Sequence, residues 1–190
     1  LEARPFLRPV LFVPGIAGTL PVEDAAHANW KDWLLNRGYD PEKLVLDPIT
    51  HSYDDIIQSL VNAGYVKGET LFVAAYDWRM PPANADGKED GRITLSASDM
   101  VKDANSKTFK TGADYLAYWM LKATDAWSKL YPGQTLDSVD VIAHSTGGLV
   151  TRAYVQSPAY GAVYDAAAKK ALPKINEFIM VGVPNQGASK

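Results

Sequence analysis

Short apolar runs alternate along the chain with segments of helical period. The apolar runs are bounded by Gly, Pro, Asn or Asp and predict buried strands at 10–13, 71–75, 139–143 and 175–183. Apolar residues recur every three or four positions in the segments that predict helices, over 52–64, 116–127, 146–155 and 164–172. Because strands and helices alternate, the pattern predicts an α/β fold in which crossover helices join parallel strands.

One stretch interrupts this alternation. The helix predicted over 52–64 begins with Ser52 and Asp55, a weak form of capping box, and stops at Gly64. Residues 81–110 are instead dominated by turn formers, and only 92–95 resembles a strand. We expect residues 1–190 to form one domain with a surface excursion at 81–110. Two interpretations of the excursion are open, a cap over the active site and a solvated loop.

Composition and charge narrow the function classes. The chain has 19 Lys and Arg against 22 Asp and Glu, scattered along its length, which argues against a nucleic-acid partner. Cysteine is absent, so disulfides, thiolate zinc sites and cysteine nucleophiles are excluded. No apolar run approaches the roughly 18 to 20 residues that span a bilayer. The sequence also has no metal-ligand spacing and no phosphate-binding glycine loop, so we expect neither a metal nor a cofactor.

The most specific local pattern is VDVIAHSTGGLV at 139–150. A β-branched strand, Ala-x-Ser-x-Gly and a helix follow one another as in a nucleophile elbow, with Ala143 in place of the first glycine. The turn is so tight that the residues two before and two after Ser145 must be small, and Ala143 and Gly147 are small. Gly148 allows the helix to pack closely on the sheet. We therefore expect Ser145 to be a nucleophile; the alternative is a plain turn in which it caps the helix.

A serine nucleophile requires an oxyanion hole. Such sites use the backbone N–H that follows the serine and one N–H from the loop after the first core strand. Thr146 supplies the first N–H by its position. The loop PGIAG at 14–18 supplies the second, with Ile16 as the favoured donor and Ala17 as the fallback. The alternative is that this Pro-Gly turn only ends a strand.

A catalytic base is not evident among the histidines. They are His27, His51 and His144, and none lies after Ser145, although the usual order along the chain is serine, acid, histidine. We expect His144 to point away from the serine hydroxyl and to serve in packing or in support of the site. His27 and His51 are expected to be exposed or to cap local structure.

The acid and base of a triad are expected elsewhere. Asp165 and Glu177 follow the serine but are predicted to lie in the middle of elements, not on loops at the carboxyl ends of strands. The sheet is expected to lack about two C-terminal parallel strands that would carry the acid and the histidine. We expect these residues beyond Lys190 or on another chain, so a missing C-terminal part of the domain is a candidate partner.

Four separated motifs point to a family. They are VPGIAGT at 13–19, Gly64-Tyr65 with the run that leads to YDWR at 76–79, AHSTGG at 143–148 and GVPNQG at 182–187. Together they resemble the lecithin:cholesterol acyltransferase-like family of α/β-hydrolases, whose elbow is shared with bacterial lipases. The likeness covers most of residues 8–190, and YDWR is its most specific part.

The resemblance implies a mostly parallel α/β-hydrolase-like sheet with helices on both faces. It implies that Ser145 is the nucleophile and that Ile16 and Thr146 form the oxyanion hole. The residues with structural roles near the site would be Gly15, Ala143, His144, Gly147, Gly148, Asp77, Trp78 and Arg79. A buried Arg79 would need a carboxylate or carbonyl partner.

The function that the resemblance implies is acyl transfer from a carboxylic ester of a lipid to water or to an alcohol. The chain would then be a serine esterase, lipase or O-acyltransferase, with a lipid or other ester as substrate and a membrane or lipid surface as a candidate partner. A secreted or periplasmic location is favoured. Two other hypotheses fit the residues: a catalytically incomplete module for binding or assembly, and a peptidase or thioesterase that uses the same Ser145 chemistry.

Overall fold

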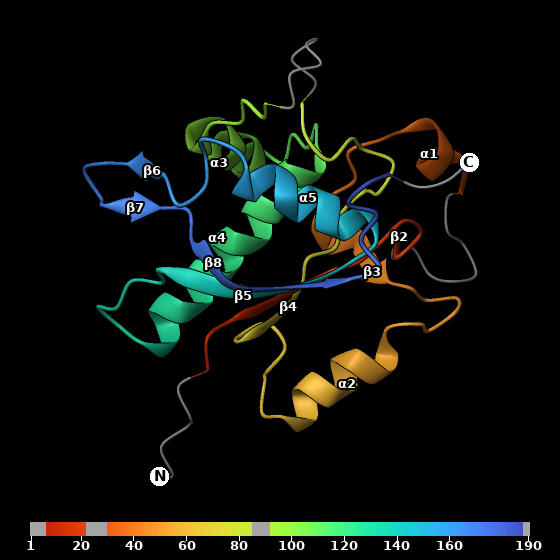
Figure 1. Ribbon diagram of the computed structural model, residues 1–190, viewed down its shortest axis with the longest axis horizontal. Coiled ribbons are helices and arrows are strands. Elements are labelled where there is room, and N and C mark those ends of the chain that lie inside the picture. The colour runs from red at the N-terminus through yellow and green to blue at the C-terminus, as the bar shows by residue number, and fades with distance from the viewer. Residues whose placement is uncertain (1–6, 22–29, 85–91, 188–190) are drawn as a thin grey trace.

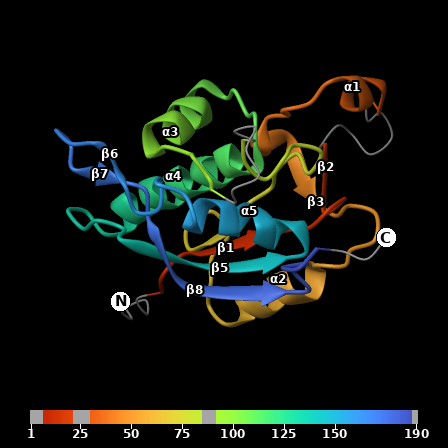
Figure 2. The same ribbon diagram turned by 45° about the horizontal axis from the view of Figure 1, so that its top comes forward.

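The computed structural model describes residues 7–21, 30–84 and 92–187, and its centre is a parallel sheet (Figure 1). The sheet has four strands in the order β4-β1-β5-β8, and every neighbouring pair is parallel. The strands are β1 (Val10–Val13), β4 (Leu71–Val73), β5 (Ser138–His144) and β8 (Lys174–Val181). Because they run in one direction, as Figure 2 shows for β1, β5 and β8, the loops at their carboxyl ends meet at one edge of the sheet.

Helices cover both faces of this sheet. On one face lies α2 (Asp54–Asn62), and on the other lie α4 (Gly112–Leu130) and α5 (Thr146–Val155) (Figure 1). The helix α3 (Ala97–Ser106) packs on α4. None of the helices in the described ranges has both the length and the hydropathy needed to cross a membrane. The predicted α/β-hydrolase-like fold class is therefore confirmed in its sheet and layers.

The position of β1 inside the sheet, with a core on each face, explains why its sequence is continuously apolar. Leu11 and Val13 belong to the large core under α3, α4 and α5, whereas Val10 and Phe12 belong to the smaller core that α2 covers. All four side chains are buried. Successive residues of a strand point to opposite faces, so a strand buried on both faces needs apolar residues at every position.

Several short elements were absent from the sequence prediction. They are the antiparallel pair β2 (Thr19–Pro21) and β3 (Leu44–Leu46), the helix α1 (Trp30–Leu35) and the 3-10 turn Pro41–Lys43. Each is at most six residues long, too short for a period to be recognised. The strand β2 directly follows the Pro-Gly loop, so it helps to position the site.

The prediction of a helix over 164–172 is wrong. The segment forms a two-stranded antiparallel hairpin of β6 (Val163–Asp165) and β7 (Lys170–Ala171). Asp165 ends β6 and accepts a hydrogen bond from the N–H of Ala168 at 3.0 Å, which forms the turn. Lys169 has a left-handed backbone with φ of 52°, which no helix interior accommodates.

The description of 81–110 as a surface excursion needs correction. Residues 85–91 lie outside the described residues, and 92–95 does not form the expected strand. The following residues form α3, whose Met100 and Ala104 are fully buried in the large core. Ser96 caps this helix by accepting from the N–H of Asp99 at 3.1 Å. Turn formers around the helix concealed its short apolar period.

The start of α2 also differs from the prediction. The helix begins at Asp54 with Tyr53 as its N-cap residue, and no side chain caps it. Ser52 is therefore not the capping residue that the sequence suggested. Its N–H donates to Oδ2 of Asp47 at 2.7 Å, because a tight turn precedes the helix.

Candidate active site

Ser145 lies at the turn between β5 and α5, at the carboxyl edge of the sheet. Its backbone has φ of 52° and ψ of −126°, a conformation that residues other than glycine rarely adopt. The N–H of Ser145 donates to the carbonyl of Val181 at the end of β8, at 2.9 Å. Such strain costs about 1 to 3 kcal/mol and persists where the surrounding structure enforces it, often at functional sites.

Small residues allow three segments to meet around this serine. A Cβ atom added to Gly15 would lie 2.8 Å from Cβ of Ser145, so the Pro-Gly loop contacts the elbow directly. A Cβ on Gly147 would lie 2.4 Å from the carbonyl oxygens of Val13 and Pro14. Ala143 is fully buried in the strand before the serine. The expected small positions are therefore places where backbones are in close contact.

Gly148 allows a different contact. A Cβ atom at this position would lie 2.2 Å from Cγ2 of Val183, in the loop after β8. The first turn of α5 is thus packed against that loop, in the GVPNQG motif. Both glycines of the Gly-Gly pair bring segments that are distant in the sequence together at the elbow.

We expect Gly147→Ala to lower the free energy of unfolding by about 3 kcal/mol, because the added methyl meets two backbone oxygens that cannot rotate away. Gly133→Ala is the control: its Cβ would have no heavy atom within 4 Å, and only the strain of a φ of 83° remains, about 1 to 2 kcal/mol. Urea denaturation followed by tryptophan fluorescence measures both. Equal losses in the two variants would contradict the close contact.

The expected oxyanion donors adjoin the contact between Gly15 and Ser145 in the sequence. Thr146 is the first residue of α5, so its N–H has no carbonyl one turn earlier in the helix. In the described part of the chain, the N–H groups of Ile16 and Ala17 have no hydrogen-bond acceptor. The Ile16 side chain is 59% exposed. The loop keeps its shape because the N–H of Gly18 donates to the carbonyl of Gly15 at 3.0 Å.

A buried tyrosine that the sequence prediction missed supports Thr146. Tyr76 follows β4, and its hydroxyl lies 3.1 Å from Oγ1 of Thr146. Burial raises the pKa of Tyr76 to about 12, so the phenol stays neutral. It can therefore orient the Thr146 side chain by a neutral hydrogen bond. Nothing in the spacing of these two residues along the chain indicated this contact.

The run Asp77-Trp78-Arg79 forms a structural clamp. Nε and Nη2 of Arg79 donate to the two carboxylate oxygens of Asp77 at 2.7 and 2.6 Å. The Asp77 side chain is fully buried and that of Arg79 is 11% exposed. The carboxylate partner expected for a buried Arg79 is thus its neighbour two residues earlier. Nε1 of Trp78 donates to the carbonyl of Thr19 at 3.0 Å, which anchors β2 after the Pro-Gly loop.

Arg79 also fastens the segment around α1. Its guanidinium donates to the backbone carbonyls of Trp33 and Asn36 and lies over the Trp33 ring, 3.4 Å from the centroid. The N–H of Gly38 donates to Oδ2 of Asp77 at 3.0 Å. The clamp therefore joins the end of β4 to residues about forty positions earlier in the chain.

The histidines and downstream acids lie in different parts of the structure. The His51 side chain is 64% exposed and pairs with Asp54, while His27 lies outside the described residues. His144 is half-buried at the end of β5, directly before the serine, and its Nδ1 lies 2.8 Å from the hydroxyl of Tyr53. Glu177 lies in the middle of β8 as expected, but Asp165 is the last residue of β6 and not in the middle of an element.

A pocket of 610 Å³ opens beside the elbow. Most of its lining is apolar, with Asp47, Thr50 and Ser52 forming a polar side. Its lining residues are Phe12, Ile16, Ala17, Gly18, Leu20, Asp47, Ile49, Thr50, Ser52, Tyr53, Ile56, His144 and Val181. The pocket thus extends from the Pro-Gly loop to α2. Among the described residues, no cluster of three or more His, Asp or Glu side chains could hold a metal ion.

Asp47 organises the polar side of this pocket. It accepts hydrogen bonds from the N–H and hydroxyl of Thr50, at 2.9 and 2.5 Å, and from the N–H of Ser52 at 2.7 Å. Burial opposes ionisation of the Asp47 carboxyl, but these hydrogen bonds outweigh it and hold the pKa below its usual range. The carboxylate therefore stabilises the turn that leads into α2.

We expect Asp47→Ala to lower the free energy of unfolding by about 2 kcal/mol near neutral pH, because hydrogen bonds to a charged carboxylate are lost. A folded-state pKa below the unfolded one means that this stabilisation is complete above about pH 4 and is lost as the pH falls further. The difference between wild type and variant should therefore shrink toward about pH 3. Urea denaturation at both pH values measures it.

Asp54→Ala is the matched control, because this neighbouring carboxylate is 63% exposed. Its removal should change stability by at most about 0.5 kcal/mol. A difference for Asp47→Ala that is independent of pH would contradict the role assigned to the carboxylate.

The fold and the elbow define a class of protein. A parallel sheet with helices on both faces carries a strained serine between strand and helix, beside the loop after the central strand. This is an α/β-hydrolase-like protein.

Comparisons with known proteins agree with the motifs. Residues 28–89 match the family model described as lecithin:cholesterol acyltransferase. Phosphatidylcholine-sterol acyltransferase of Oryctolagus cuniculus is 29% identical over 96 residues, 49% of this chain and 22% of that protein. The protein of the same name from Homo sapiens is 28% identical over the same shares of both chains. Lysosomal phospholipase A and acyltransferase of Canis lupus familiaris is 27% identical over 100 residues, 48% of this chain and 22% of that protein.

The predicted resemblance to the lecithin:cholesterol acyltransferase family is thereby confirmed, and the matched part spans about a fifth of the length of these relatives. No solved structure matches the chain significantly. The family model covers the clamp at Asp77 and Arg79 and ends before Ser145.

Proposed function

We propose that the chain carries the nucleophile and oxyanion hole of a serine lipid esterase or acyltransferase. The observation that carries this proposal is the strained backbone of Ser145 at a strand-to-helix turn that Gly15 of the Pro-Gly loop contacts directly. The N–H groups of Ile16 and Thr146, the residues that directly follow Gly15 and Ser145, have no acceptor among the described residues. The matched relatives named above are acyltransferases and a phospholipase, which supports an ester of a lipid as the substrate class.

The reaction would proceed through an acyl-enzyme. Oγ of Ser145 attacks the ester carbonyl carbon while a histidine outside the described residues takes the hydroxyl proton. The carbonyl oxygen becomes an oxyanion that accepts from the N–H groups of Ile16 and Thr146, each worth roughly 3 to 4 kcal/mol of barrier. The alcohol then leaves with the proton from the histidine. Water or an acceptor alcohol attacks the acyl-enzyme and releases Ser145.

The pocket beside the elbow suits the apolar part of such a substrate. Its walls include Ile16, Leu20, Ile56 and Val181, and its volume is 610 Å³. Ligand pockets of this size are typically apolar with a few polar groups that fix orientation. We propose that it receives the acyl chain, and that the acid and histidine of the triad come from a further segment or another chain.

A fluorophosphonate probe tests the proposal, because it forms a covalent bond only with an activated serine. The full-length protein should be labelled, and peptide mapping should find the adduct on Ser145. Absence of labelling at Ser145, with correct folding shown by circular dichroism, would instead favour a catalytically incomplete module for binding or assembly.

A further inference from the structure

The hydroxyl of Tyr53 joins the two halves of the site. It accepts a hydrogen bond from the N–H of Gly15 at 3.2 Å and lies 2.8 Å from Nδ1 of His144. Gly15 directly precedes the expected oxyanion donor Ile16, and His144 directly precedes Ser145. One oxygen atom therefore connects the oxyanion loop to the nucleophile turn, although these residues are far apart in the sequence.

The direction of these hydrogen bonds follows from what each group can donate. The Gly15 amide is only a donor, so the Tyr53 oxygen must accept from it. Among the described residues, the only acceptor near the Tyr53 hydroxyl proton is Nδ1 of His144. The arrangement that uses the Tyr53 proton within the described residues is the one in which Tyr53 donates to Nδ1 and His144 is protonated on Nε2.

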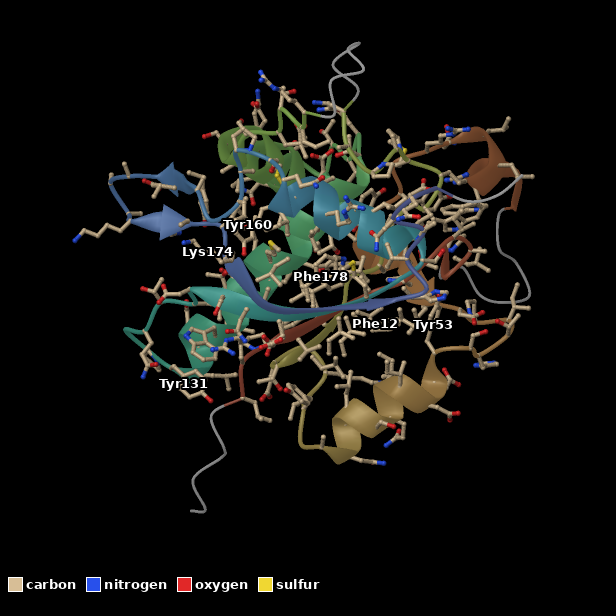
Figure 3. The ribbon with its side chains drawn as sticks, viewed as in Figure 1. Phe12, Tyr53, Tyr131, Tyr160, Lys174 and Phe178 are labelled. Carbon is tan, nitrogen blue, oxygen red and sulfur yellow. The ribbon has the colours of Figure 1, made fainter. Side chains whose placement is uncertain are left out.

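Packing holds the Tyr53 ring where this contact needs it. The ring meets Phe12 edge-on, with centroids 5.1 Å apart, and meets His144 in the same way at 5.6 Å. Figure 3 shows Tyr53 and Phe12 beside each other on the α2 side of the sheet. At the backbone, Tyr53 is the N-cap residue of α2, directly after the turn that Asp47 stabilises. These contacts restrain the half-buried ring, so its hydroxyl is held between the two loops.

We infer that Tyr53 is a positioning residue for the oxyanion hole. By fixing Gly15 relative to His144, it sets the distance between the Ile16 N–H and Ser145, the two groups that must act on one carbonyl. This inference rests on the proposed acyl-enzyme function. Donors must lie within a few tenths of an ångström of the oxyanion position, and a displacement of about 1 Å can cost 10²-fold in rate.

Tyr53→Phe tests the inference, because it removes the hydroxyl and keeps the ring against Phe12. We expect the fluorophosphonate inactivation rate constant kinact of the full-length protein to fall about 10- to 100-fold, while the inhibitor constant KI changes less than about two-fold. Tyr65→Phe is the matched control, since Tyr65 packs in the same small core beyond the other end of α2. It should leave kinact unchanged.

A spectroscopic readout separates positioning from packing. In ¹⁵N-histidine-labelled protein, His144 should show the tautomer protonated on Nε2, and the Nδ1 resonance should shift in Tyr53→Phe but not in Tyr65→Phe. An Nδ1 resonance that is the same in Tyr53→Phe as in the wild type would overturn the inference. An unchanged kinact in Tyr53→Phe, with wild-type labelling at Ser145, would overturn it and leave the proposed function standing. Absence of labelling at Ser145 in the wild type would overturn both.

Discussion

Ser145→Ala is expected to lower the rate of ester hydrolysis by the full-length protein by about 10⁶-fold. Removal of Oγ would abolish the proposed acyl-enzyme route and leave only what the proposed oxyanion donors and substrate binding contribute. The fold should be unaffected, because the hydrogen bond from Ser145 to Val181 is made by the backbone and survives in alanine. The measurement is kcat/KM for a p-nitrophenyl ester of a medium-length fatty acid, together with thermal unfolding of both proteins.

Ser138→Ala is the control for this experiment. Ser138 begins β5, so it lies on the same strand at the end away from the elbow. Its substitution should leave kcat/KM within about two-fold of wild type. A Ser145→Ala variant that retained a tenth or more of the activity would show that another residue carries the reaction.

The second large effect concerns stability. Asp77→Ala is expected to lower the free energy of unfolding by about 3 to 5 kcal/mol, because it leaves the guanidinium of Arg79 buried without its counter-charge. The N–H of Gly38 also loses its acceptor. Since whole domains are stable by only about 5 to 15 kcal/mol, this loss is a large fraction of the total. Urea denaturation followed by tryptophan fluorescence gives the value.

Two further variants test whether the loss of stability comes from the buried charge of Asp77. Asp77→Asn keeps an acceptor for the N–H groups but not the charge, so it should cost less than alanine and remains measurable if Asp77→Ala does not fold. Asp137→Ala removes an exposed carboxylate and should change stability by at most about 0.5 kcal/mol. An Asp77→Ala loss below about 1 kcal/mol would mean that the pair contributes little beyond its own desolvation.

Elements with strong local signals could be predicted from the sequence. The bounds expected for the first strand and for the helix after Ser145 agree with β1 and α5. A strand buried on both faces needs an unbroken apolar run, and an elbow needs small residues around its serine. Both requirements act within a few residues, so they are visible as a pattern.

Elements that depend on distant contacts could not be predicted. The segment 164–172 has apolar residues at helical spacing, yet it forms the hairpin of β6 and β7, and β6 contacts α3 about sixty residues earlier in the chain. The helix α3 was missed because its apolar pattern extends over only 10 residues and turn formers surround the helix in the sequence. Its burial is decided by packing on α4.

The sequence by itself determined the class of fold, the family resemblance and the position of the candidate nucleophile, because periodicity, small residues and short motifs are local properties. Only the tertiary structure decided how the site is held together. Asp77 pairs with its neighbour Arg79, and the pair also forms hydrogen bonds with the backbone of a segment some forty residues earlier. Tyr53 meets Gly15 and His144 across 38 and 91 positions, and contacts at such separations are created by strand order and packing, which no local pattern records.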